Sequence, residues 1–144
     1  MVVYADTSFL VALYGRDDNT LEARRVATGR RHPFVFTPLH RHESRNAVRL
    51  ALFRGQITAD EAVAVLHAMD GDIQGGTLQE TPILWDEVFA RAEGLSAAHT
   101  AGIGARAMDI LHVAAAMALG SGEFLTFDLR QKALAAAGGL KVGP

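Results

Sequence analysis

Four acidic residues lie within or directly beside apolar segments of this sequence: Asp6, Glu43, Asp109 and Asp128. Carboxylates gathered near apolar surfaces repel one another, and their pKa values rise unless a cation neutralises them. Oxygen ligands in a chain without cysteine favour hard ions, Mg²⁺ or Mn²⁺, over zinc. Such an ion lowers the pKa of a bound water, orients a phosphate and stabilises a leaving oxygen. The chemistry that these residues suggest is metal-dependent hydrolysis of a phosphodiester.

Asp109 is the acid that is hardest to explain by structure alone. Between residues 107 and 117 only Asp109 and His112 are polar, which predicts a helix that is apolar nearly all round and buried. An unpaired carboxylate there would cost on the order of several kcal/mol, so it needs a cation or a proton. The structural alternative is an ion pair with an arginine such as Arg106. His112 is better explained as a core histidine with satisfied hydrogen bonds than as a metal ligand.

Glu43 lies on the inner face of a predicted helix. Leu39 and Ala47 stand one turn before and after it, and further apolar residues continue the same stripe. One acid therefore occupies a place where an apolar residue would be expected. Asn46 shares this face and could support the acid by hydrogen bonding. A residue at the boundary of the buried face would explain the pattern equally well.

Asp6 and Asp128 each follow a predicted strand and precede a predicted helix. Aspartate at such a position is a favoured helix N-cap, which explains either residue without a ligand. In open α/β sheets, however, ligands bind beyond the carboxyl ends of the strands, at the point where neighbouring strands diverge. If the first and fourth strands are neighbours, we expect the two carboxylates to converge there.

The elements that must position these acids alternate between short β-like runs and amphipathic helices. Capping residues followed by proline mark helix starts at Thr37-Pro38 and Thr81-Pro82, and Gly55 and Gly71 are expected to end helices. The pattern predicts strands over 2–5, 34–36, 77–80, 124–126 and 140–142, and helices over 7–14, 21–29, 38–54, 58–70, 82–97, 105–119 and 129–137. Because the strands are separated by helices, we expect a three-layer α/β/α fold with a central parallel sheet of four to five strands. Residues 1–144 are expected to form this fold as a single domain.

The composition is that of an ordinary globular protein, with 49% hydrophobic residues, 21% charged residues and a formal net charge of -2. It excludes a strongly basic protein that coats nucleic acid. Arg41, Arg45 and Arg49 form a row on one helix face that could contact RNA phosphates, although a solvated face explains the row equally well. The sequence shows neither a signal peptide nor an apolar run of membrane-spanning length, which predicts a cytoplasmic protein without a membrane partner.

The acids occur in motifs that resemble those of the PIN domain family, and specifically of the VapC toxin ribonucleases of type II toxin–antitoxin pairs. The segment 6–10, Asp-Thr-Ser-Phe-Leu, resembles the family's opening motif, and Glu43 stands at the position of its lone glutamate. The segment 109–114 is similar to the D-x-x-H-x-A motif, and 126–128 resembles the closing T-x-D. No single motif is specific, but together they keep the family's order and spacing over nearly the whole chain.

The resemblance implies a PIN-like fold and an Mg²⁺- or Mn²⁺-dependent endoribonuclease in which the four acids hold the metal. Ser8 and Thr126 would support the acids as polar neighbours. It further implies that RNA is cleaved to leave a 3′ hydroxyl, that the protein is a homodimer, and that it is the toxin of a toxin–antitoxin pair.

The same resemblance implies a cognate antitoxin that blocks the site. Its groove is expected along Leu10, Leu13 and Tyr14, together with the helices predicted over 38–54 and 58–70. His40 and His42 near Glu43 are less typical of the family and are candidates for making the site sensitive to pH.

Two other functions fit parts of the pattern. A phosphatase that forms an aspartyl phosphate would also place Asp6 after the first strand, but such an enzyme usually has a second Asp two residues on, where this chain has Ser8. A non-catalytic binding module on the same fold would not need four intact acids. Hydrolysis of small phosphomonoesters would reveal the first, and absence of magnesium binding would favour the second.

Overall fold

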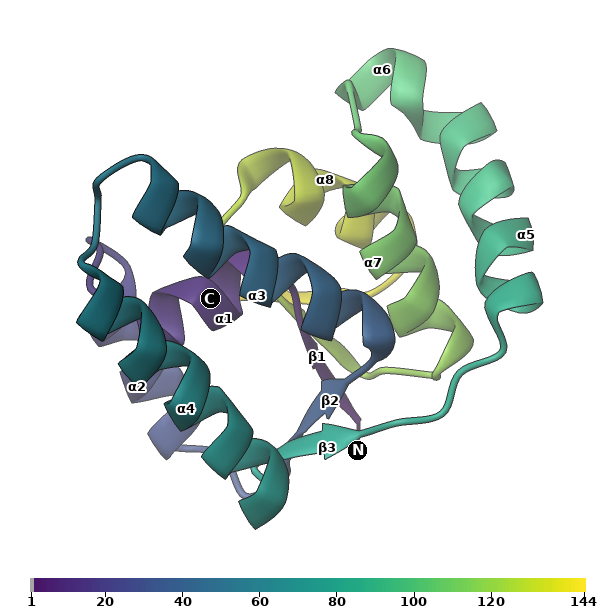
Figure 1. Cartoon of the computed structure of the whole chain (residues 1–144). Coiled ribbons are helices and arrows are strands. Elements are labelled where there is room, and N and C mark those ends of the chain that lie inside the picture. The colour runs from purple at the N-terminus through teal and green to yellow at the C-terminus, as the bar shows by residue number, and fades with distance from the viewer. Residues whose placement is uncertain (1) are drawn as a thin grey trace.

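The computed structural model describes residues 2–144 and holds one sheet of five parallel strands (Figure 1). Met1, the first residue of the predicted domain, lies outside the described residues. The strands are β1 (Val3–Ala5), β2 (Phe34–Phe36), β3 (Leu78–Glu80), β4 (Glu123–Leu125) and β5 (Lys141–Gly143), in the order β3-β2-β1-β4-β5. β1 therefore pairs directly with β4, with Ala5 opposite Leu125. The predicted parallel sheet is confirmed, and the residues that follow β1 and β4 emerge at the same edge.

Helices connect the strands and cover both faces of the sheet. They are α1 (Thr7–Tyr14), α2 (Thr20–Thr28), α3 (Pro38–Phe53), α4 (Ala59–Gly75), α5 (Trp85–Leu95), the π-helical turn η1 (Ser96–Thr100), α6 (Ala101–Ile103), α7 (Ala107–Ala118) and α8 (Leu129–Ala137). Within residues 2–144, none of these helices has both the length and the apolar character needed to cross a membrane.

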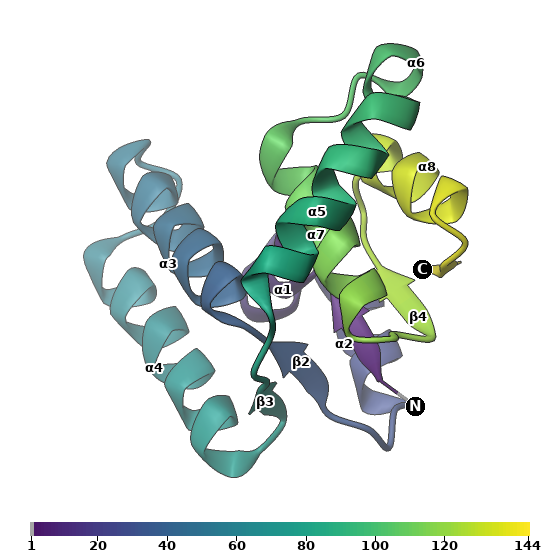
Figure 2. The ribbon, with the colours of Figure 1, turned by 90° about the vertical axis from the view of Figure 1, so that its right-hand side faces the viewer.

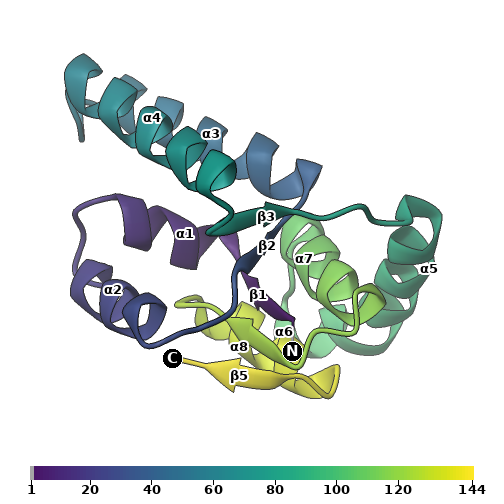
Figure 3. The same ribbon diagram turned by 90° about the horizontal axis from the view of Figure 1, so that it is seen from below.

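The alternation of side chains along each short strand builds a core on both faces of the sheet. Tyr4, Val35 and Phe124 pack with α5, α7 and α8. Their strand neighbours, such as Ala5 and Leu125, pack on the opposite face with α1, α2 and α4. Figure 3 shows the strands between α1 and α2 on one side and α5 and α7 on the other. The three-layer α/β/α arrangement is thereby confirmed.

α3 begins where β2 ends and packs against α1 and α4 (Figure 2). The predicted start is confirmed, because Thr37 Oγ1 accepts a hydrogen bond from the His40 amide and Pro38 occupies the first helical position. The His40 side chain completes the cap, because its Nδ1 accepts a hydrogen bond from the Thr37 amide at 3.0 Å. This cap fixes the direction in which α3 carries Glu43 away from the sheet.

Two predicted helix boundaries are wrong. Gly71 does not end α4, which continues for another turn to Gly75 and stops at Gly76, where φ is +81°. A glycine inside a helix costs only about 1 kcal/mol of helix stability. The packing of the last turn of α4 against the core, through Ile73, outweighs this cost. Thr81-Pro82 does not start α5, because the Thr81 amide still bonds the Phe36 carbonyl as a continuation of β3. The helix begins only at Trp85, so an extended segment over 81–84 separates β3 from α5.

Candidate active site at the carboxyl ends of the strands

Asp6 is buried directly after β1, with 1% of its surface exposed. One carboxylate oxygen accepts hydrogen bonds from Ser8 Oγ at 2.7 Å and from the Phe9 amide at 2.9 Å. The other accepts one from Thr126 Oγ1 at 2.6 Å. The bond from Phe9 is an N-cap of α1, so the structural role considered for Asp6 is real. It uses only one of the carboxylate's hydrogen bonds, and the other two come from side chains that no cap requires.

Ser8 and Thr126 also join the β1 turn to the β4 turn. Each hydroxyl donates a hydrogen bond to Asp6 and accepts one from a backbone amide. Ser8 Oγ accepts a hydrogen bond from the Phe127 amide at 3.1 Å, and Thr126 Oγ1 accepts one from the Asp128 amide at 3.0 Å. Because both hydroxyls are held as donor and acceptor at once, their orientation is fixed. The two residues expected to support the acids thus lie in contact with Asp6.

Burial raises the pKa of Asp6 above its ordinary value. The hydrogen bonds from Thr126, Ser8 and the Phe9 amide, and the nearby His112, act in the opposite direction but do not outweigh burial. An ionised carboxylate here gains from any cation that can approach it.

Asp109 and Asp128 share one arginine. Arg106 Nε donates to Asp109 Oδ2 at 2.9 Å, and its Nη2 lies 3.6 Å from Asp128 Oδ2. The ion pair weighed as the structural explanation of Asp109 therefore exists, and it draws a second acid to the same place. Asp128 also caps α8 by accepting the Gln131 amide at 2.9 Å. As with Asp6, the cap does not account for the whole carboxylate, because Asp128 also faces Arg106.

Glu43 reaches this region from α3 and is held by a histidine. His112 Nε2 lies 3.1 Å from Glu43 Oε1, while His112 Nδ1 lies 2.8 Å from the hydroxyl of Tyr4. Burial acts to raise the pKa of Glu43, but the hydrogen bond and charge of His112, with Thr7 and His40, outweigh it and leave the pKa below its ordinary value. Glu43 also lines an open hollow of about 420 Å³ together with Arg106 and Asp109.

Asn46 does not take the predicted part in supporting Glu43. It is exposed on α3, and it makes no hydrogen bond to Glu43 in the described part of the chain. On a helix, residues three positions apart share a face only approximately, and the Glu43 side chain turns towards α7 instead. His112 provides the support that Asn46 was expected to give.

The donor set fits a hard divalent ion, although the acids are paired with other groups. Across residues 2–144, no three His, Asp or Glu side chains lie together as a ready metal site. The cation between Asp109 and Asp128 is Arg106, whose side chain is 66% exposed and can leave without disturbing the core. Without Arg106, the carboxylates of Asp109 and Asp128 would be available to hold such an ion beside the hollow that Glu43 lines.

The comparisons with known proteins concern the fold. No protein-family model matches the sequence, and no curated protein is significantly similar to it. A crystal structure of VapC20 from Mycobacterium tuberculosis, described as a toxin that cleaves the sarcin–ricin loop, superposes with a TM-score of 0.68. The alignment covers 94% of this chain and 95% of that one, at 20% sequence identity.

The chain has a VapC-like PIN fold. The expected fold is thereby confirmed over 94% of the chain. The four acids lie in this VapC-like fold at or beside the carboxyl edge of its sheet, on the turns after β1 and β4 and on α3 and α7.

The arginine row on α3 is broken up by ion pairs in this VapC-like fold. Arg41 Nη2 lies 2.6 Å from Glu80 Oε1, and Arg45 pairs with Asp70 of α4. Arg49 is exposed. The three side chains therefore do not form one uniform basic strip, because two of them are already matched by acids from neighbouring elements.

His40 is part of the frame of the VapC-like fold rather than a pH sensor. It is fully buried, with Nε2 lying 2.8 Å from the Ala5 carbonyl. Because a carbonyl only accepts, Nε2 carries the proton and Nδ1 accepts from Thr37. Burial, followed by the charge of His112, lowers the pKa of His40 to about 3. Near neutral pH it does not titrate, so this expectation is wrong for His40; His42 is exposed.

Proposed function

We propose that this chain is an Mg²⁺- or Mn²⁺-dependent endoribonuclease and the toxin of a toxin–antitoxin pair, with residues 1–144 acting as a single PIN-like domain. The observation that carries the proposal is the sharing of Arg106 by Asp109 and Asp128, next to the hollow that Glu43 lines. These acids come from separate elements, and a fold gains nothing from bringing like charges together unless a cation is to bind them. RNA as the substrate rests on the motifs and on the likeness to a toxin that cleaves RNA.

The side chains have distinct parts in this proposal. Asp6, Glu43, Asp109 and Asp128 would hold the ion, which supplies charge neutralisation and activation of water for phosphodiester hydrolysis. Thr126 and Ser8 fix the orientation of Asp6, and His112 fixes that of Glu43. Arg106, once it leaves the acids, is free to face the phosphate of the substrate.

The phosphatase alternative gains no support from the geometry. Ser8 occupies the place where an aspartyl-phosphate enzyme usually has its second Asp, and its hydroxyl is already used between Asp6 and the Phe127 amide. It has no free proton to give to a leaving group.

An apolar hollow of about 360 Å³ between α1, α3 and α4 suits the antitoxin. Its lining includes Leu10, Tyr14, Ala47, Val65 and Met69, all on helices. Leu13, which we expected in this groove, lines a different hollow that lies against α2 and β2. An apolar face of the antitoxin would cover the first hollow in the way that an amphipathic segment fills a helix-lined groove. The homodimer and the cytoplasmic location stay predictions, and light scattering of the purified protein tests the first.

Cleavage of single-stranded RNA with and without Mg²⁺ or Mn²⁺ tests the function. We expect cleavage by the unaltered protein, its loss in EDTA, and loss of at least about a hundredfold in Asp6→Asn and Asp109→Asn, as is usual when a group that stabilises the reaction is removed. Asp86→Asn, at an exposed site on α5, is the matched control and should keep full activity. Full cleavage by well-folded Asp6→Asn would refute the proposal.

A further inference from the structure

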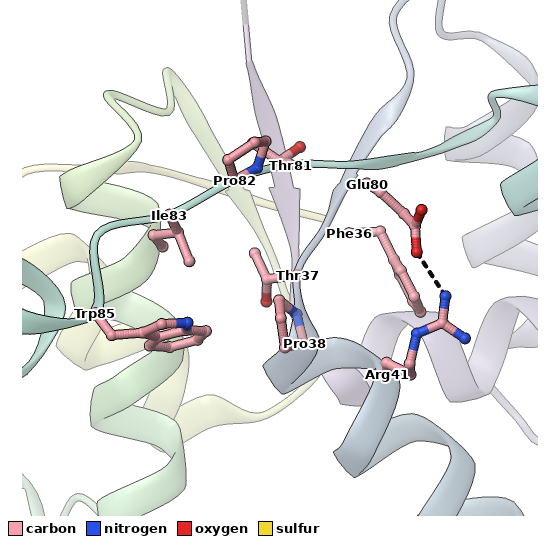
Figure 4. Close-up of a pocket in the computed structure, with 9 residues that line it drawn as sticks. All are labelled: Phe36, Thr37, Pro38, Arg41, Glu80, Thr81, Pro82, Ile83 and Trp85. Atoms are coloured by element: carbon pink, nitrogen blue, oxygen red, sulfur yellow. Dashed lines mark hydrogen bonds and ion pairs between the residues drawn. The ribbon is translucent and has the colours of Figure 1, made fainter.

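Another hollow, of about 450 Å³, opens at the carboxyl ends of β2 and β3 (Figure 4). We call it the Trp85 pocket; its walls include Phe36, Pro38, Arg41, Glu80, Ile83 and Trp85. In Figure 4 the indole of Trp85 lies on one side and the Arg41–Glu80 ion pair on the other, with Pro38 between them. The pocket thus has a flat aromatic wall facing a polar one.

The aromatic wall is held in place and still accessible. Trp85 packs against the core beneath α5 and α7 but is only partly buried, so some of its surface is open. Trp85 is the first residue of α5. The helix was predicted to start at residue 82, but residues 82–84 precede it as an extended segment. That late start of α5 creates the space between Trp85 and the beginning of α3.

The polar wall offers a donor and an acceptor side by side. Arg41 lies 5.6 Å above the ring of Phe36 and pairs with Glu80 at 2.6 Å. The two side chains are 42% and 63% exposed, so they can exchange part of this pairing for a ligand at little cost. Because the pair is neutral overall, the wall suits an uncharged group with both donors and acceptors better than it suits a phosphate.

The Trp85 pocket lies beside the candidate active site. The pocket opens at the carboxyl ends of β2 and β3, and β2 pairs with β1, whose carboxyl end carries Asp6. Neighbouring strands lie about 4.8 Å apart, so the pocket and the turn after β1 share one edge of the sheet. A polymer with one phosphate at the acids can therefore reach the pocket with a neighbouring unit.

We propose that the Trp85 pocket binds an unpaired base of the RNA next to the phosphate that is cut, stacked on Trp85 with its edge towards Arg41 and Glu80. The inference rests on the proposed function, because it takes RNA as the substrate. Unpaired bases are recognised by stacking on aromatic rings and by hydrogen bonds to their edges. The pocket provides both, and it would select where the RNA is cut.

The fluorescence of the protein reports on this pocket directly, since Trp85 is its only tryptophan. In EDTA, where no cleavage occurs, we expect a single-stranded RNA oligonucleotide to quench the fluorescence on binding. An abasic oligonucleotide of equal length has the same phosphates and no bases, and it should not quench. Trp85→Ala should weaken RNA binding by about 5- to 150-fold, and Trp85→Phe should retain most of the affinity. Phe89→Ala removes an exposed aromatic from the same helix and should bind normally.

The outcomes separate this inference from the proposed function. Equal quenching by the abasic oligonucleotide, or unchanged affinity in Trp85→Ala, overturns the base pocket even if RNA is cleaved. Quenching by RNA in a protein that never cleaves RNA supports the pocket and removes the proposed function. If Trp85→Ala does not fold, two measurements still test the base pocket: the quenching comparison on the unaltered protein and the RNA affinity of Trp85→Phe.

Discussion

Nε2 of His112 lies 3.1 Å from Oε1 of Glu43, and this contact links three layers of the protein. A carboxylate only accepts hydrogen bonds, so Nε2 donates to Glu43, and Nδ1 is paired with the hydroxyl of Tyr4 at 2.8 Å. Glu43 on α3 is thereby held by α7, which is in turn held by β1. The histidine that satisfies the core is the same one that positions a candidate metal ligand.

Replacing His112 should lower the stability of the protein. His112→Ala leaves a cavity and an unsatisfied Tyr4 hydroxyl, which should lower the free energy of unfolding by about 2–4 kcal/mol in urea titrations. Tyr4→Phe removes only one hydrogen bond and should cost about 1 kcal/mol. His67→Ala, at an exposed position on α4, serves as the control and should change little. A His112→Ala protein as stable as the control would contradict the assigned contacts.

His40 should make the fold sensitive to acid. Its pKa is about 3 in the fold and near 6.5 in the unfolded chain, so the unfolded chain binds the extra proton between these values. Its contribution to stability is complete above pH 6.5 and is lost as pH falls towards 3, by up to about 1.4 kcal/mol per pH unit. Urea unfolding at pH 7 and pH 5 measures this loss. In His40→Gln the loss should be smaller by about 1–2 kcal/mol, and equal losses in the two proteins would show that His40 is not responsible.

Arg106 should compete with the metal. Arg106→Gln removes the cation that pairs Asp109 and Asp128, so Mn²⁺ binding measured by calorimetry should tighten by about 2- to 5-fold, the worth of an exposed ion pair. Arg91→Gln removes a comparable exposed pair on α5, with Glu87, and should leave Mn²⁺ binding unchanged. Weaker binding in Arg106→Gln would mean that the arginine helps to hold the site together rather than blocking it.

Asp6→Asn should stabilise the protein in the absence of metal. Because burial raises the pKa of Asp6, its contribution to stability is full below the ordinary value of 3.8 and is lost as pH rises through the higher pKa of the folded state. At pH 7 the asparagine removes this buried charge, so thermal unfolding in EDTA should shift upwards. The gain should shrink as pH falls below the ordinary value of 3.8, where Asp6 becomes neutral in both states. A variant that is less stable at pH 7 would show that the hydrogen bonds of Asp6 outweigh its burial.

Ala47→Asp should separate antitoxin binding from catalysis. Ala47 lines the apolar hollow between α1, α3 and α4, where a buried charge would lower affinity for the antitoxin by at least about tenfold. The partner to test is the small protein encoded beside this gene, if there is one, with binding followed by pull-down and calorimetry. Phe53→Asp, at an exposed site on the same helix, is the control. RNA cleavage should persist in both variants, and normal antitoxin binding by Ala47→Asp would exclude the hollow.

The sequence predicted the positions of the acids in the fold more accurately than it predicted the side chains that contact them. Asp6 and Asp128 follow strands, and the pairing of β1 with β4 was enough to bring their turns to one edge. The support of Glu43 was predicted wrongly because side-chain direction on α3 depends on how α7 lies across it. Arg106 was considered as one possible partner of Asp109, whereas its reach to Asp128 requires the packing of α7 against α8.

Local signals also misplaced the start of α5. Threonine followed by proline is a good helix start in isolation, but the Thr81 amide is taken by the Phe36 carbonyl of β2. Sheet pairing of this kind cannot be seen from neighbouring residues. The same error hid the Trp85 pocket, which exists only because residues 81–84 remain extended.

The hydrogen bond between Asp6 and Thr126 joins residues 120 positions apart, and this separation sets an order of events during synthesis. A ribosome adds roughly 5–20 residues per second, so Asp6 waits for about 6–24 s before Thr126 has been added. Until then β1 lacks its β4 neighbour, and Asp128 does not yet exist. The candidate site is therefore incomplete on the nascent chain until translation is almost finished.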